Sequence, residues 1–178
     1  MLESPSMTDP IALLVHDHRR MEGMLGELLD ANVKDRAHLL ANVADALAAH
    51  VALEEEHFYP AVRARRTEDI LLESLEEHLS LKRVMHDLLA MSTSDDRWEA
   101  KMHVLKEQAE HHHKEEEEHL FPKVEKLFDR AQIEELGAAM KKAHDALLAE
   151  RPRGRIFGGT KEAARLSSPD VEPLSQRA

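Results

Sequence analysis

The chain has 178 residues, a formal net charge of -11 and no cysteine. This length suits one domain with a sizeable core, and 42% hydrophobic with 33% charged residues is typical of a soluble globular protein. The acidic charge disfavours nucleic acid and anionic membranes as main partners, because both repel a negative protein. Without cysteine, disulfides, thiolate zinc sites and cysteine-ligated iron–sulfur clusters are excluded, so any bound metal must have nitrogen and oxygen ligands.

The N-terminal sequence has neither the basic nor the apolar region of a signal peptide. No run in the chain approaches the roughly 18 apolar residues that a membrane-spanning helix needs. We therefore expect a cytoplasmic protein with no membrane partner.

Apolar residues recur at intervals of three and four between positions 11 and 150, which predicts helices and no strands. The expected helices run from Thr8 or Asp9 to about Asn32, from Asp35 to the region of Pro60, from Thr67 onward, from Ser94 or Asp95 onward, and over about 131–149. Short connections between long helices favour antiparallel neighbours. The sequence thus predicts an all-α fold, an antiparallel up-down-up-down four-helix bundle with a short fifth helix packed on its outside.

The character of the sequence changes at Arg151, where glycine and proline interrupt the helical period. The segment from there to the end holds six basic and three acidic residues. We predict a helical domain over residues 9–150 and a loosely ordered basic tail over 151–178, which could contact an acidic surface or a neighbouring subunit.

One pattern occurs twice, at residues 50–60 (HVALEEEHFYP) and 112–122 (HHKEEEEHLFP). On a helix, positions i, i+4 and i+7 share one face, which groups His50, Glu54 and His57 in the first copy. The same spacing groups His112, Glu116 and His119 in the second copy. Both faces continue apolar stripes, so these polar side chains are predicted to point into the bundle.

Two further histidines, His18 and His78, occupy positions where the first and third helices should bury an apolar residue. Buried carboxylates are costly unless they are paired, and a cation would pair them with the surrounding imidazoles. Nitrogen and oxygen ligands suit iron, manganese or zinc, and one carboxylate can bridge two ions. The sequence therefore predicts a shared metal site, with His57 and His119 either completing it or supporting it from the rim.

The duplicated motif, preceded by Asp17-His18-Arg19 and Glu77-His78, resembles the hemerythrin-like (HHE cation-binding) family over residues from about 9 to 128. The resemblance implies a non-haem di-iron centre with an oxo or hydroxo bridge inside a four-helix bundle, and zinc or manganese as substitutes. Transferred position by position, it implies as ligands His18, His50, Glu54, His78, His112 and Glu116, with both glutamates bridging.

The chain departs from the oxygen-carrying members of that family at Lys82, where they have a further histidine ligand. The departure puts classical reversible oxygen carriage in doubt. It leaves coordination positions to which dioxygen, peroxide or nitric oxide could bind, unless His57 and His119 close them.

The sequence is compatible with three functions. The first is a metal-binding protein that binds or reacts with small oxidants in sensing or detoxification, and peroxide decomposition would make it an enzyme. The second is a ferritin-like iron oxidase or storage module, because Glu54-x-x-His57 and Glu116-x-x-His119 match the motif of those bundles. The third is a non-catalytic iron or oxygen sensor that acts through a protein partner or a second copy of the chain.

Overall fold

The computed structural model describes residues 9–64 and 66–166, and within these ranges it contains helices and connections but no strand. The helical elements are α1 (Pro10–Leu29), α2 (Val33–Leu53), η1 (Glu54–Phe58), α3 (Tyr59–Val62), α4 (Glu68–Ala90), α5 (Trp98–Glu115), η2 (Glu116–Leu120), α6 (Phe121–Leu127), α7 (Arg130–Glu150) and α8 (Gly154–Gly158). The prediction of an all-α fold is confirmed.

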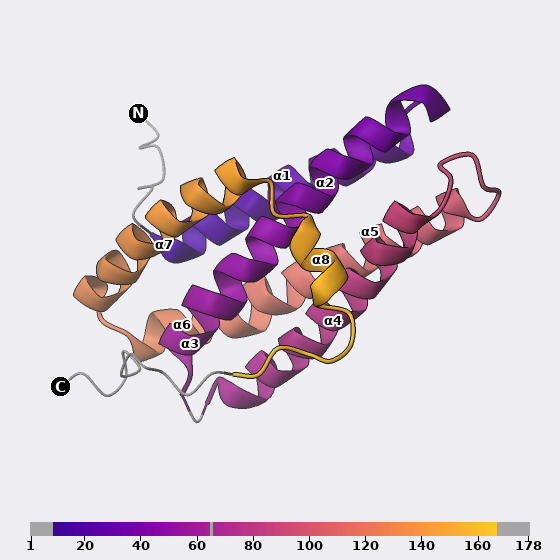
Figure 1. Ribbon diagram of the computed structural model, residues 1–178. Helices are drawn as coiled ribbons and strands as arrows, with labels where there is room; N and C mark the ends of the chain where they lie inside the picture. The colour runs from indigo at the N-terminus through magenta and orange to yellow at the C-terminus, as the bar shows by residue number, and fades with distance from the viewer. Residues whose placement is uncertain (1–8, 65, 167–178) are drawn as a thin grey trace.

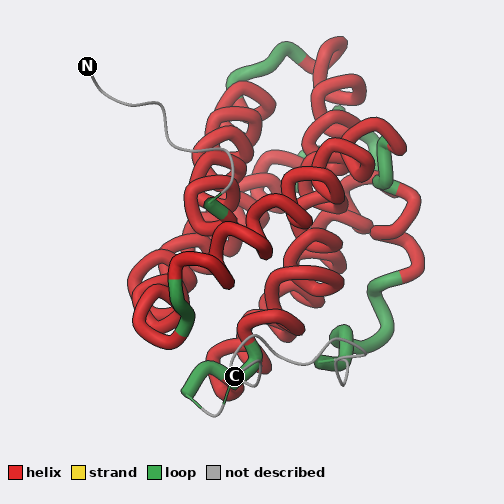
Figure 2. The backbone as a smooth tube through the Cα atoms, turned by 90° about the vertical axis from the view of Figure 1, so that its left-hand side faces the viewer, coloured by secondary structure: helices red, strands yellow, loops and turns green. Residues whose placement is uncertain are grey.

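The helices form a bundle in which α1 packs against α2 and α5, and α4 packs against α5 and α2. The connections after α1 and α4 lie at one end of the bundle, and those after α3 and α6 lie at the other (Figure 1). Helix α7 packs along α1 and α2 on the outside (Figure 2). It has 21 residues, as many as α2, so the expected short fifth helix is a full-length one.

The helix ends follow from local hydrogen bonding. The Asp9 side chain accepts from the backbone N–H groups of Ile11 and Ala12 and so caps α1, as the sequence predicted. A capping box between Asp129 and Gln132 starts α7. The second helix begins slightly earlier than expected, because Asn32 has the extended backbone of an N-cap residue and the chain is helical from Val33.

The buried apolar residues form two clusters, separated along the bundle by a layer of polar side chains. On α1, Leu13 and Leu14 belong to one cluster and Met21 and Leu25 to the other, with His18 between them. The same order holds on α4, where His78 lies between Leu75 and Leu81. This layer therefore crosses the middle of the core and holds the residues that the sequence singled out.

Each repeated motif contains a single π-helical turn, η1 in the first copy and η2 in the second. Such a turn has one more residue than an α-helical turn, so it rotates the residues after it around the helix axis. Phe58, the last residue of η1, and Tyr59 after it are buried, where α-helical spacing would place His57. Leu120 and Phe121 are buried at the same two positions of the second copy. π-Helical turns of this kind are frequent at functional sites.

The segment after Glu150 is docked on the bundle through residue 166, which differs from the expected loose tail. Ile156 on α8 is 1% exposed and belongs to an apolar cluster. Arg155 pairs with Glu56, and the Arg83 guanidinium donates to the backbone carbonyls of Thr160 and Lys161. The remaining residues of the predicted tail, 167–178, lie outside the described part of the chain.

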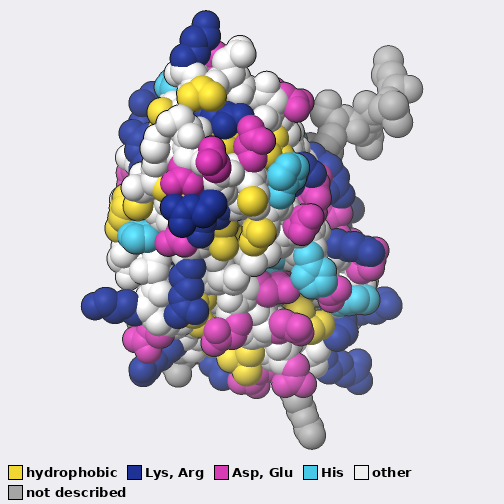
Figure 3. Space-filling view, turned by 90° about the vertical axis from the view of Figure 1, so that its right-hand side faces the viewer, with side chains coloured by type: hydrophobic (Ala, Val, Ile, Leu, Met, Phe, Trp, Pro, Cys, Tyr) yellow, Lys and Arg dark blue, Asp and Glu magenta, His cyan; other side chains and the backbone are white. Residues whose placement is uncertain are grey.

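None of the helices in the described ranges combines the length and the apolar character required to cross a membrane. On the face in Figure 3, basic and acidic side chains are interspersed and do not form one continuous patch of either sign.

We predict that Ile156→Ala lowers the free energy of unfolding by about 2 kcal/mol or more, because it leaves a cavity under α8. The neighbouring Phe157→Ala is the control, since that side chain is 52% exposed and its loss should change stability by less than about 0.5 kcal/mol. Urea unfolding of both variants measures the difference. Equal effects would mean that α8 does not contribute to the core.

Candidate metal centre

The six predicted ligands come together in the polar layer, and none is more than 1% exposed: His18, His50, Glu54, His78, His112 and Glu116. Helices α1 and α4 contribute one histidine each. The two motif-bearing segments contribute a histidine from the last turn of α2 or α5 and a glutamate from the first residue of the π-helical turn.

Glu54 lies at the middle of the cluster. Its Oε2 atom is 3.3 Å from His50 Nε2 and 3.1 Å from His78 Nε2, and its Oε1 atom is 4.0 Å from His18 Nε2. Two groups, each with ligand atoms within 4.8 Å of one another, share this residue: His18, His50, Glu54 and Glu116, and Glu54, His78 and His112. A carboxylate common to two such groups is placed as a bridging carboxylate would be.

Glu116 has two different environments for its two oxygens. Oε2 is 3.3 Å from His18 Nε2 and 3.7 Å from His112 Nε2. Oε1 accepts a hydrogen bond of 2.8 Å from the Tyr59 hydroxyl. Burial and the charges of Glu116 and Glu54 raise the pKa of Tyr59 well above its ordinary value, so the phenol stays protonated and remains a donor.

Carboxylates outside the cluster orient three of the four histidines. The Nδ1 atoms of these rings lie close to a carboxylate oxygen, 2.9 Å for His18 and Glu117, 3.1 Å for His78 and Glu55, and 2.8 Å for His112 and Glu77. A carboxylate on Nδ1 fixes the ring orientation and leaves Nε2 as the inward ligand atom. Glu55 and Glu117 directly follow Glu54 and Glu116 in the motif. Each therefore orients a histidine on a helix that does not carry the motif.

Lys82, at the position where the resemblance implies a histidine in oxygen carriers, contacts one of these supporting carboxylates. Its side chain is largely buried, and its Nζ atom is 2.9 Å from Glu55 Oε1. The carboxylate of Glu55 thus binds both Lys82 and His78. Lys82 thus contacts the cluster through Glu55.

The charges of the cluster are balanced within a space that water does not reach. Burial by itself would raise the pKa of Glu54, but the charge of His50 and the contact with His112 hold it well below its ordinary value. Burial would also lower the pKa of His112, yet the charge of Glu116 and the contacts with Glu54 and Glu77 raise it to about 10. The two carboxylates thus require positive charge beside them.

A metal ion fits this requirement. Among the described residues, the buried side-chain atoms without a hydrogen-bond partner include His18 Nε2, His50 Nε2, both Glu54 oxygens and Glu116 Oε2. Unpaired polar atoms in a core are costly, and a shared cation would satisfy all of these at once. Imidazole nitrogen and carboxylate oxygen suit iron, manganese and zinc.

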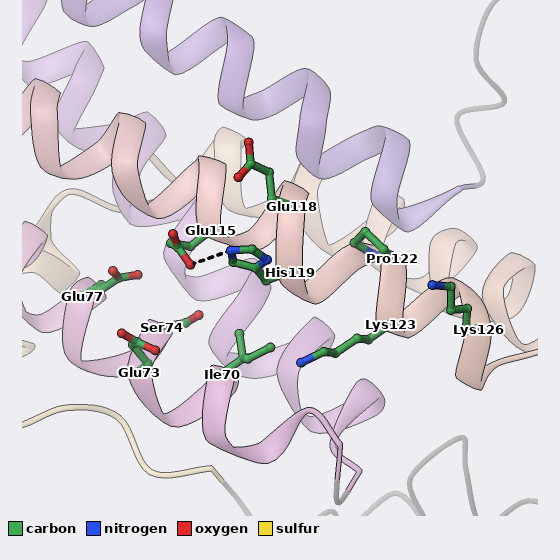
Figure 4. Close-up of a pocket in the computed structure, with 10 residues that line it drawn as sticks. All are labelled: Ile70, Glu73, Ser74, Glu77, Glu115, Glu118, His119, Pro122, Lys123 and Lys126. Carbon is green, nitrogen blue, oxygen red and sulfur yellow. Dashed lines mark ion pairs between the residues drawn. The ribbon is translucent and has the colours of Figure 1, made fainter.

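His57 and His119 lie apart from this cluster. His57 is partly exposed, and neither residue belongs to a group of possible ligands in the described chain. The His119 side chain is 54% exposed and its Nε2 atom is 3.4 Å from Glu115, in a surface cavity of about 450 Å³ that Figure 4 shows. The π-helical turns account for both positions, because they rotate these residues away from the face that α-helical spacing predicts.

His113, which directly follows the predicted ligand His112, is buried beside the cluster. It is 1% exposed, its ring stacks on His18 at 4.0 Å with an angle of 7° between planes, and its Nδ1 atom is 3.2 Å from Glu22. It also forms a close group with His18 and His50. An ion bound by an imidazole lies in the ring plane, and two stacked parallel planes cannot share one ion, so His113 packs on His18 as a supporting ring.

His144 is the other buried histidine that the sequence pattern did not reveal. It lies on α7, and its Nε2 atom is 2.7 Å from Asp17 on α1. No local spacing could identify this pair, because the two residues are 127 positions apart.

Two comparisons with known proteins concern the family and the fold of this chain. The model of the hemerythrin HHE cation binding domain matches residues 9–107, which contain the first motif copy and the histidines of α1 and α4. The crystal structure of a hemerythrin HHE cation binding domain-containing protein from Mycobacterium kansasii superposes with a TM-score of 0.70 at 22% identity, over 88% of this chain and 94% of the other. At that identity the likeness concerns the fold. Comparison with curated proteins found no match.

Glu55→Gln should weaken binding of the first divalent metal by about tenfold, because a neutral amide holds His78 less firmly than a carboxylate does. Glu56→Gln is the matched control, since the adjacent side chain is half exposed and pairs with Arg155 outside the cluster. Competition with a chromophoric chelator measures both affinities. Similar losses in the two variants would contradict the supporting role of Glu55.

Proposed function

Because the chain belongs to the hemerythrin HHE cation-binding family, we propose that the six buried side chains hold two iron ions and that this centre binds or reacts with small oxidants. The observation that carries the proposal is Glu54, whose two oxygens are buried, lack hydrogen-bond partners and lie between two groups of ligand atoms. A carboxylate in that position can bridge two ions a few ångströms apart. The proposed ligands are His18, His50, Glu54, His78, His112 and Glu116.

The two proposed metal positions have unequal numbers of protein ligands. Besides Glu54, one group contains His18, His50 and Glu116, and the other contains His78 and His112. An ion held by the second group would have more positions free for a ligand from solution, and the Tyr59 hydroxyl lies 3.3 Å from His78 Nε2. The asymmetry supports binding of dioxygen, peroxide or nitric oxide on the side of His78.

Bound iron would supply the electrons for reduction of such an oxidant. The protein side chains shape the environment of the proposed metal ions. The buried rings of Phe58 and Phe121 exclude water, and the protonated Tyr59, which donates to Glu116 Oε1, lies beside the more open group. These features support a role in sensing or detoxification, and decomposition of peroxide would be an enzymatic form of it.

The orientation of His57 and His119 separates this proposal from the ferritin-like alternative. That alternative requires the histidines of both Glu-x-x-His motifs at the metal ions. In the described structure His119 is exposed and neither residue joins the ligand groups. The geometry therefore supports a hemerythrin-like ligand set.

A series of contacts that leads from His78 to the segment after α8 favours the sensor version of the proposal. His78 contacts Glu55, Glu55 contacts Lys82, and a side chain at Gly159 would meet Lys82 Cδ at 3.0 Å. A change at His78 could thus reach the segment that follows α8 and, through it, a protein partner or a second copy of the chain.

The decisive experiment is anaerobic reconstitution of the full chain with ferrous iron. We expect about two irons per chain by metal analysis, and absorption changes on separate addition of oxygen, peroxide and nitric oxide. Protein that stays metal-free or binds a single ion after this treatment would overturn the di-iron proposal. A di-iron protein whose spectrum responds to none of the three would overturn the proposed reactivity alone.

Substitution separates the competing ligand sets. His18→Ala and His78→Ala should each lose at least one iron per chain, because each removes a buried nitrogen from a different ligand group. His57→Ala and His119→Ala are the matched controls and should keep their iron. The reverse pattern, with loss only in the two controls, would support the ferritin-like alternative.

A further inference from the structure

Helix α7 contributes a buried polar side chain next to the centre, although it lies outside the four helices that supply the proposed ligands. His144 is 8% exposed, and its Nε2 atom is 2.7 Å from Asp17 Oδ2, so the imidazole N–H donates to this carboxylate. Asp17 itself is 5% exposed and precedes the proposed ligand His18 in α1. The contact therefore connects α7 to the inner side of the bundle.

Asp17 is also the carboxylate that faces the outer nitrogen of His50. Its Oδ2 atom is 3.8 Å from His50 Nδ1, whereas the other three proposed histidine ligands have carboxylates within hydrogen-bond distance of Nδ1. Asp17 Oδ1 and His50 Nδ1 are both buried and without a hydrogen-bond partner. Because His50 Nδ1 is 3.8 Å from Asp17 Oδ2, only a small movement is needed for this ring to donate to the carboxylate.

Asp17 lies between two imidazole rings. Its Oδ2 atom accepts from His144 on α7, and the same atom faces His50 Nδ1 at 3.8 Å. A carboxylate oxygen can accept more than one hydrogen bond, so Asp17 can accept from His144 and from His50.

We infer that His144 is a positioning residue of the metal centre, because it holds Asp17 against His50 and so couples the docking of α7 to metal binding. This inference rests on the proposed metal site. A carboxylate on the outer nitrogen of a histidine ligand fixes the ring and increases its basicity. Loss of the residue that holds this carboxylate should therefore lower the affinity for the metal. The coupling is reciprocal, and metal binding must therefore stabilise the docking of α7 by the same free energy.

The test measures binding of cobalt(II), a spectroscopic substitute for iron, to the full chain. His144→Leu should weaken cobalt binding by about tenfold and alter the visible spectrum of the bound ion, because Asp17 loses its donor. His144→Gln should restore most of the affinity, since its amide nitrogen can donate from nearly the same place. Asp17→Asn should weaken binding as well, and adding His144→Leu to it should cause no further loss.

The control separates support of the metal from packing of the helix. Leu147→Ala removes a buried side chain of α7 that is 5% exposed, so it should lower stability yet leave cobalt affinity and spectrum unchanged. Hydrogen exchange provides an independent measurement of how firmly α7 is docked. Metal should slow the exchange of α7 amides in the wild-type chain, and much less so in His144→Leu.

Each outcome has a defined meaning. Unchanged affinity in His144→Leu, no rescue by glutamine, additive losses in the double variant, or an equal loss of affinity in Leu147→Ala would overturn the inference while leaving the metal site in place. A wild-type chain that binds neither cobalt nor iron would overturn the proposed function and this inference together.

Discussion

Two carboxylates in the middle of an apolar core are the constraint on which the rest of the structure depends. Glu54 and Glu116 are fully buried, and a carboxylate in such a place costs several kcal/mol unless positive charge compensates it. Four histidines surround them and divide the core into two apolar clusters. The centre of the bundle therefore lacks continuous apolar packing and holds a site whose unpaired atoms include five that a cation would bind: His18 Nε2, His50 Nε2, both Glu54 oxygens and Glu116 Oε2.

Each copy of the repeated motif has two roles at the cluster. The first glutamate of each pair, Glu54 or Glu116, enters the cluster, and the second, Glu55 or Glu117, holds the histidine of α4 or α1. Each copy therefore supplies ligands and also orients a ligand that belongs to neither copy. The arrangement requires the π-helical turns after each histidine, because they turn aromatic and apolar side chains inward behind the glutamates.

Elements outside the four-helix bundle reach the same cluster through its supporting carboxylates. Helix α7 contacts Asp17 through His144, and the segment after α8 packs on Lys82, which binds Glu55. Both contacts are buried or partly buried, so they can transmit small displacements of a histidine to the outer helices. The family match ends at residue 107, before the second motif copy and these outer helices, and the buried contacts join those later residues to the matched ones.

The sequence alone determined the helices, the inward histidines of α1 and α4, and the two histidine-to-glutamate pairs, because all of these depend on spacing along a regular helix. It did not determine the positions of His57 and His119, since one extra residue in a helical turn changes the face on which later residues lie. Nor could it place His113, His144 or Lys82, whose partners Glu22, Asp17 and Glu55 are distant in the chain. Only tertiary packing decides such contacts, because burial brings together polar groups whose pairing leaves no local pattern.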